Sequence, residues 1–250
     1  MALAGLVLIS IGLLDLARDL RPPRWTGLRS GILTALLAGV VVVAAASVAL
    51  SLGYSAFAAL APLVAVAAWW ALLPDRPLRS PRLALGLPVL LAVAIVLLIA
   101  LPAPGGPSVL RDAYATTSFA SAVSLDGILL IAGVTLFLVS PGNRIVRIAL
   151  QDEIGPGAAT SSATPVVGGL KGGRLIGPLE RILILGLFVA NAAAVIAALI
   201  AAKGIVRFPE ISKDAEGGNR AEYFLIGSLV SWATALAGVG ALWLAHLLPV

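Results

Sequence analysis

The sequence predicts an all-α fold, a polytopic membrane helical bundle of about seven transmembrane helices, and three observations indicate it. Only 12% of the 250 residues are charged, against about 25% in soluble domains, and mean hydropathy is +1.06. Several apolar runs are about 20 residues long, which is the length that crosses a hydrocarbon layer about 30 Å thick. Short segments rich in Arg and Pro separate these runs. Lipid is therefore expected to solvate most of the surface.

The apolar runs place the expected helices in order. They cover residues 2–16, 32–52, 56–73, 83–101, 125–139, 182–202 and 223–244. Gly53-Tyr54-Ser55 is expected to form a tight turn, and Trp69 and Trp70 are expected near the membrane interface, where indoles are enriched. The first and fifth runs are short, so six or eight spans remain alternatives. The chain divides into helices 1–5 (1–140), a cytoplasmic Gly/Ser/Pro-rich linker (141–172) and a two-helix unit (173–250).

The distribution of cations predicts the orientation. With the N-terminus outside, segments 17–31, 74–82 and 141–181 face the cytoplasm and hold 12 of the 17 Lys and Arg residues. The turn at 203–222 then lies outside, where its four cations are balanced by four acids. Cytoplasmic loops of membrane proteins carry such an excess, so the net charge of +5 indicates membrane orientation and not a nucleic-acid partner.

Several classes of site are disfavoured by composition. The chain has no cysteine and a single histidine, His246, so no disulfide and no multi-histidine metal site is expected. No phosphate-binding GxxxxGK[ST] loop, HExxH zinc motif or GxSxG elbow occurs. We therefore expect no metal and no cofactor, and the sequence favours a protein without enzymatic activity over an enzyme. Asp15, which could pair with Arg18, and Asp126 stand near the ends of apolar runs and are assigned no chemistry.

The charged residues gather around the sixth expected helix. Glu180 and Arg181 either anchor the start of that helix or face the interior, where Glu180 would pair with a basic residue of another helix. Asn191 falls mid-span and is expected to join helices or to line a polar path. Lys203 and Arg207 share a face and are either interface anchors or the cationic mouth of an anion site. The predicted binding residues are Glu180, Arg181, Asn191, Lys203, Arg207, Glu210, Glu222 and Tyr223.

Three patterns in the last third carry a family resemblance. They are Gly-x-x-Ile-Gly-x-Leu-Glu-Arg (173–181), Ala-Ala-Lys-x-x-x-Arg-Phe-x-Glu-Ile (201–211) and Ala-Glu-Tyr-x-x-Ile-Gly-Ser-Leu-x-Ser (221–231). This block resembles a bacterial family of multi-pass membrane proteins of unknown function. Pro178 and Pro209 depart from that pattern, and Pro209 predicts that the helix ends at Phe208. The resemblance implies a membrane fold, an important charged block and, because the family is bacterial, a location in the inner (plasma) membrane.

Two function classes follow from these features. The first is a transporter or channel-like protein that handles a small anionic solute or lipid headgroup at Lys203 and Arg207, with Glu180 and Glu222 as counter-charges. The second is a non-catalytic membrane subunit or scaffold of a larger complex, since no catalytic constellation is present. The expected partners are the lipid bilayer, an anionic lipid or solute, and a second copy or another membrane subunit.

Overall fold

The computed structural model describes residues 1–20, 28–73, 81–158, 173–212 and 219–247, apart from a few side chains at the helix ends that border the gaps. Every regular element among these residues is a helix, which confirms the all-α prediction. In chain order the elements are α1 (Ala2–Asp19), α2 (Leu28–Ser51), η1 (Ala58–Leu60), α3 (Ala61–Leu72), α4 (Pro81–Ala100), α5 (Val109–Ala115), η2 (Ser118–Ser121), α6 (Leu125–Val139), α7 (Pro141–Ala158), α8 (Gly173–Val189), α9 (Ala193–Ser212) and α10 (Asn219–Leu244).

Three helical stretches of the described chain are long and apolar enough to cross a membrane. They are Gly31–Ser51 in α2, Leu125–Gln151 across α6 and α7, and Glu222–Leu244 in α10. Shorter apolar helices cover Ala58–Leu72, Leu85–Ala100 and Ala193–Val206. Length and composition alone therefore support three of the seven expected spans.

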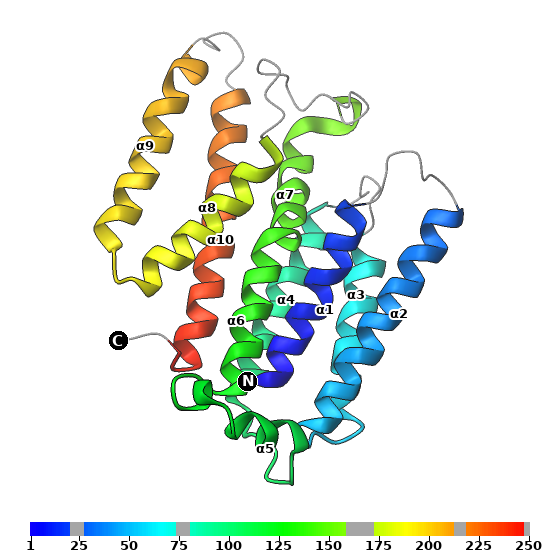
Figure 1. Ribbon diagram of the computed structural model, residues 1–250. Coiled ribbons are helices and arrows are strands. Elements are labelled where there is room, and N and C mark those ends of the chain that lie inside the picture. The colour runs from blue at the N-terminus through cyan, green and yellow to red at the C-terminus, as the bar shows by residue number, and fades with distance from the viewer. Residues whose placement is uncertain (21–27, 74–80, 159–172, 213–218, 248–250) are drawn as a thin grey trace.

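The first helix forms the centre of the bundle. α1 packs against α2, α3, α4, α6 and α7, so side chains all round it are buried, from Leu3 to Leu14 (Figure 1). A helix that is apolar on every face is stable only where protein or lipid surrounds it. This position fills the middle of the bundle with aliphatic side chains.

Glycines let α1 and α6 approach closely. A Cβ atom on Gly5 would lie 2.5 Å from the backbone of Leu129, and one on Gly133 would lie 2.6 Å from the carbonyl oxygen of Gly5. Small residues at such a crossing allow backbones to meet, which strengthens packing between apolar helices. The α1–α6 pair is thus the tightest part of the described core.

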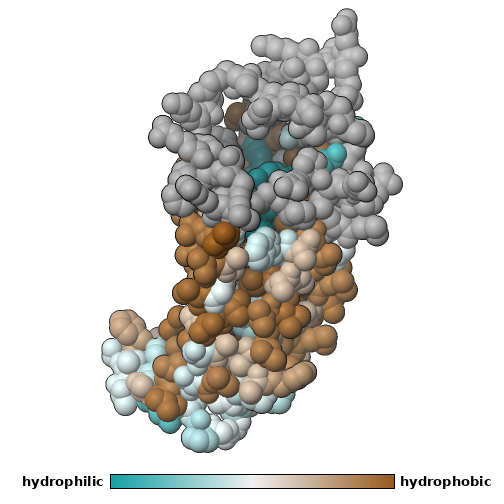
Figure 2. Space-filling view, turned by 90° about the vertical axis from the view of Figure 1, so that its right-hand side faces the viewer, coloured by the Kyte–Doolittle hydropathy of each residue, from teal (hydrophilic) through white to brown (hydrophobic). Residues whose placement is uncertain are grey.

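The outer surface is a belt of exposed apolar side chains. Leu36 and Val40 on α2 are 62% and 68% exposed, and Leu90 on α4 is 68% exposed. Figure 2 shows the α2 side as a mainly brown band above the more polar end that carries α5. A contiguous apolar surface of this kind is unusual on a protein surrounded by water and fits contact with lipid.

The C-terminal unit differs from the expected pair of helices. The sixth run was predicted as one helix over 182–202, but the chain reverses at Asn191 and forms two helices, α8 and α9. Asn191 has a φ of 54°, a conformation that Asn tolerates better than most residues. Its N–H bonds to Phe188 O at 3.0 Å and the next N–H, of Ala192, bonds to Leu187 O at 2.9 Å, which closes α8 with a Schellman motif.

This reversal moves the start of α10 to the other end of the bundle from the predicted one. The end of α9 and the start of α10 lie at the same end as the end of α1 and the start of α2 (Figure 1). The sequence instead placed the turn at 203–222 on the opposite side. The error follows from counting 182–202 as a full crossing, since a hairpin returns the chain to the side from which it came.

Two helix boundaries also differ from prediction. The linker was expected from residue 141, but Pro141 opens α7, because proline suits the first turn of a helix. The low-complexity centre of this linker was expected at 155–169, and residues 159–169 of it lie outside the described residues. α9 continues through Pro209 to Ser212, beyond the predicted end at Phe208. The predicted turn after α2 is confirmed, with Gly53 at a φ of 84°.

Candidate functional site

Glu180 joins three helices. It lies near the middle of α8, not at a helix start as one alternative required, because α8 begins at Gly173. Its Oε2 atom lies 2.5 Å from Nζ of Lys203 on α9, and its Oε1 atom accepts a hydrogen bond from Nε1 of Trp232 on α10 at 3.0 Å. The Lys203 ammonium also lies 5.3 Å from the Trp232 ring centroid. The prediction that Glu180 pairs with a base on another helix is confirmed.

Lys203 is the less buried partner of this pair. The Lys203 side chain is 23% exposed and the Glu180 side chain 8% exposed. A second ring, that of Phe224, lies 5.8 Å from the ammonium, so the cation sits between a carboxylate and two aromatic faces. These contacts tie α9 to α8 and α10 near the charged end of the hairpin.

Arg181 completes the end of α6. Its guanidinium is buried and donates to the carbonyl oxygens of Leu138 at 2.7 Å and Val139 at 3.4 Å. Both carbonyl groups lie in the last turn of α6, where no helical N–H follows to donate to them. In a continuous helix the N–H of Asn143 would donate to Val139 O, but here it donates to Ser140 O. Asn143 Oδ1 accepts from the same guanidinium at 2.6 Å, and Ser231 Oγ accepts at 3.1 Å. Arg181 thus replaces the backbone donors lost at the α6–α7 break.

The other predicted site residues do not all join this cluster. Asn191 is exposed at the α8–α9 turn, remote along α9 from Lys203. Glu222 on α10 is exposed and Tyr223 is half-buried, and neither takes part in the cluster that the described residues form. Arg207 and Glu210 belong to the α9 backbone, but their side chains lie outside the described residues. Of the eight predicted residues, the structure brings together Glu180 and Lys203, with Arg181 behind them.

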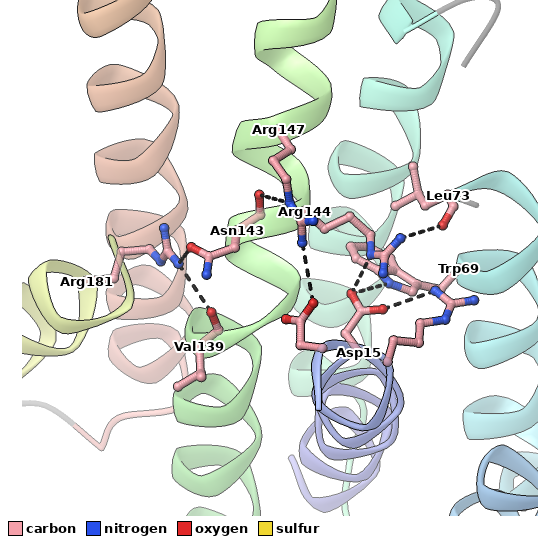
Figure 3. Close-up of polar contacts among 10 residues, drawn as sticks. Asp15, Trp69, Leu73, Val139, Asn143, Arg144, Arg147 and Arg181 are labelled. Atoms are coloured by element: carbon pink, nitrogen blue, oxygen red, sulfur yellow. Dashed lines mark hydrogen bonds and ion pairs between the residues drawn. The ribbon is translucent and has the colours of Figure 1, made fainter. Parts of the chain in front are cut away.

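A second buried cluster, centred on Asp15, was assigned no chemistry from the sequence. Asp15 on α1 is 1% exposed and accepts hydrogen bonds from Trp69 Nε1 on α3 at 2.9 Å and from Arg144 Nε on α7 at 3.0 Å (Figure 3). Arg18 donates to the other carboxylate oxygen at 3.1 Å, as the sequence suggested. Trp69 is therefore a buried hydrogen-bond donor and not an interface anchor, while Trp70 is 39% exposed.

Arg144 also serves a helix end. Its NH1 atom donates to the carbonyl oxygen of Leu73, the C-cap residue of α3, at 3.1 Å. The sequence offered one signal for this cluster, because a carboxylate within an apolar run must find a partner. It suggested Arg18, three residues away, but gave no sign of Arg144, since Asp15 and Arg144 stand 129 residues apart.

A third cluster lies at the opposite end of the bundle. Arg111 on α5 holds Asp126 at the start of α6 through two contacts of 3.1 Å and donates to Leu52 O, just past α2, at 2.7 Å. Its guanidinium carbon lies 6.0 Å from the ring centroid of Tyr54. Burial raises the pKa of the Tyr54 phenol above its ordinary value.

The three clusters share one chemical task. Arg111, Arg144 and Arg181 each donate to carbonyl oxygens at the end of another helix. Guanidinium groups suit this position because helix C-termini carry partial negative charge. Such capping matters most in lipid, where an unsatisfied carbonyl costs several kcal/mol. Their hydrogen-bonding capacity is therefore used within the fold.

The described residues offer little that would hold a polar ligand. They contain no group of three or more His, Cys, Asp or Glu side chains placed to bind a metal ion. A hollow of about 230 Å³ between α1 and α2 is lined by apolar residues such as Leu13, Leu37 and Val41. The arrangement can join helices and stabilise charges, and the partly exposed Lys203 is a cation for which an anion could compete with Glu180.

Comparison of the chain with protein-family models, with curated protein sequences and with solved structures finds no match. The resemblance of the last third to a bacterial membrane family stays a prediction.

Proposed function

We propose that the protein is a multi-pass integral membrane protein of a bacterial inner membrane that acts as a non-catalytic subunit or scaffold. The apolar belt on α2, α4 and the outer helices supports the membrane placement, as do the three helices long enough to cross. The shorter helices α1, α3 and α4 pack beside these three and would cross with them. The α8–α9 hairpin would enter the bilayer and return.

The cations support an orientation with the N-terminus outside. The end of the bundle where α1 finishes, which carries Arg18, Arg144 and Arg147, would face the cytoplasm, and the end that carries α5 with Arg111 would face outward (Figure 1). The hairpin strengthens this bias, because segment 203–222 then joins the Arg-rich segments on one side. Cations retained on the cytoplasmic side are the usual determinant of orientation.

One observation carries the scaffold proposal over transport. The buried charged groups of the described residues are engaged with helix ends, counter-charges or amides, and α1 fills the bundle centre with apolar side chains. A solute path needs polar groups that can exchange protein partners for solute. Here the polar groups instead complete interrupted helices, which favours a rigid membrane framework.

Transport keeps one supporting observation. Lys203 is partly exposed and touches a single carboxylate, so an anionic headgroup or solute could displace Glu180 from it. In this alternative, Lys203 would be the group that contacts the anion, and Trp232 would hold Glu180 after the exchange.

Reconstitution into liposomes separates the two functions. We expect the wild-type protein to show no flux of chloride, phosphate or organic anions, and no lipid scrambling, above protein-free vesicles. The protein should instead migrate on native gels, after gentle solubilisation at native expression, as a defined complex larger than the single chain. Flux that Lys203→Ala abolishes and Lys203→Arg retains would reject the scaffold in favour of transport.

A further inference from the structure

We propose that the α8–α9 turn lies in a homodimer interface, where Asn191 of one chain hydrogen-bonds Asn191 of a second copy across a two-fold axis. The inference rests on the proposed placement in a bilayer and adds to it the identity of a partner. Its starting point is a polar turn that the described residues leave exposed.

The turn lies at membrane depth. Both ends of the hairpin are at the end of the bundle where α1 finishes and α2 starts, and the turn lies at a level between the two ends of α10 (Figure 1). The apolar part of α9, Ala193–Val206, is about 21 Å long at 1.5 Å per residue. This is less than the roughly 30 Å of the hydrocarbon layer. With Lys203 near one surface, Asn191 falls about 18 Å along the helix, close to the middle of the layer.

Lipid cannot satisfy such a turn. The Schellman motif uses the N–H groups of Asn191 and Ala192, and Ala192 O accepts from Val195 and Ile196, but the first two N–H groups of α9, at 193 and 194, have no acceptor among the described residues. The Asn191 side chain is exposed and makes no hydrogen bond with any described residue. Irregular backbone at this depth is tolerated only where protein or water covers it. Another polar surface must therefore meet the turn.

A second copy of the chain matches this surface. An asparagine amide has two donors and an acceptor, so two such amides related by a two-fold axis can exchange paired hydrogen bonds. Two-fold dimers are the commonest closed assemblies, and they place the same residue of each chain at the axis. Exposed alanines at 190, 193, 194 and 197 let two turns approach closely, and the exposed side chains of Val189 and Val195 add apolar surface that a second copy would cover. An anionic ligand fits less well, because Lys203 lies about 18 Å along α9 from the amide.

Single-cysteine cross-linking tests the dimer, since the chain has no cysteine. In native membranes oxidised with copper phenanthroline, Ala190→Cys, which keeps Asn191 and places the thiol on the exposed neighbouring residue of the turn, should form a disulfide-linked dimer of the chain. Val40→Cys is the matched control, because Val40 is 68% exposed on α2, on the opposite side of the bundle. It should remain monomeric under the same conditions.

A second variant separates the amide from the shape of the turn. Asn191→Gly keeps a residue that accepts a positive φ but removes the side-chain amide. Its dimer should dissociate at about tenfold higher protein concentration in detergent, measured by light scattering. An Asn191→Gly dimer as tight as the wild-type dimer would overturn the role of the amide.

The other outcomes identify other occupants. Ala190→Cys that stays monomeric and unreactive overturns the dimer in favour of lipid, and a cross-link to a different protein overturns it in favour of a hetero-complex. Labelling of the cysteine in the α8–α9 turn by a membrane-impermeant thiol reagent overturns the dimer in favour of a water-filled cavity. Labelling of Val40→Cys by that reagent would contradict the membrane placement itself, whereas a protected Val40→Cys with a monomeric Ala190→Cys rejects the dimer alone.

Discussion

The substitution Arg181→Ala tests whether this buried cation is a structural cap or part of a ligand site. The guanidinium donates to Leu138 O and Val139 O at the end of α6, and both lie in a region with little water. A buried acceptor left without a donor costs about 1–3 kcal/mol, so two carbonyls cost about 2–6 kcal/mol. Removal of the buried charge also relieves its own desolvation, so we expect a net loss of about 2–4 kcal/mol in the free energy of unfolding.

The loss can be measured by unfolding in mixed micelles, followed by the fluorescence of the five tryptophans. Arg147→Ala is the control, because the Arg147 side chain is 60% exposed on the neighbouring helix α7 and contacts Asp19 at 3.6 Å. That variant should change the unfolding free energy by less than about 1 kcal/mol. Arg181→Lys should recover part of the loss, since one ammonium cannot reach acceptors on α6, α7 and α10 together.

The result that refutes this reasoning is an Arg181→Ala protein as stable as the Arg147→Ala control. Arg181 would then not replace the missing backbone donors, and water or a rearranged α6 end would supply them. A role of Arg181 in anion binding would instead be indicated if Arg181→Ala lost anion binding but kept its unfolding free energy.

Two further predictions use the same unfolding assay. Gly133→Ala should cost about 1–3 kcal/mol, because its Cβ would lie 2.6 Å from Gly5 O and force α1 and α6 apart. Gly186→Ala, with no atom within 4 Å of the new Cβ, should leave stability unchanged or raise it by up to about 1 kcal/mol; equal losses at both sites would contradict the close packing. Asp126→Asn should cost about 1 kcal/mol by weakening the Arg111 pair, whose side chains are 23% and 16% exposed. That difference should shrink at 1 M salt, and a salt-independent loss would speak against an electrostatic origin.

The sequence predicted that buried charged residues pair, but it did not identify most of the partners. The sequence indicated that Glu180 needs a base on another helix, because an acid beside an apolar run is costly alone, and Lys203 fills that role. The same rule applied to Asp15, but it could not identify Trp69 and Arg144, which come from distant segments. Which partner meets which acid depends on how the helices pack.

The break at Asn191 shows where hydropathy fails. Residues 182–202 are apolar on average, so a sliding count joins them into one helix, yet a single asparagine with a φ of 54° reverses the chain. Asparagine adopts this conformation at modest cost, and it also occurs within continuous helices. The choice between the two depends on tertiary contacts, here the ties from Glu180 to Lys203 and Trp232.

Composition alone determined that this chain folds as helices with apolar outer faces, because backbone groups in a dry environment must pair within each segment. Tertiary structure decided that α1 occupies the centre, that arginines cap the ends of α2, α3 and α6, and that the sixth run folds back on itself. The physical reason is that burial of apolar surface has no direction, whereas a hydrogen bond requires one donor at one place.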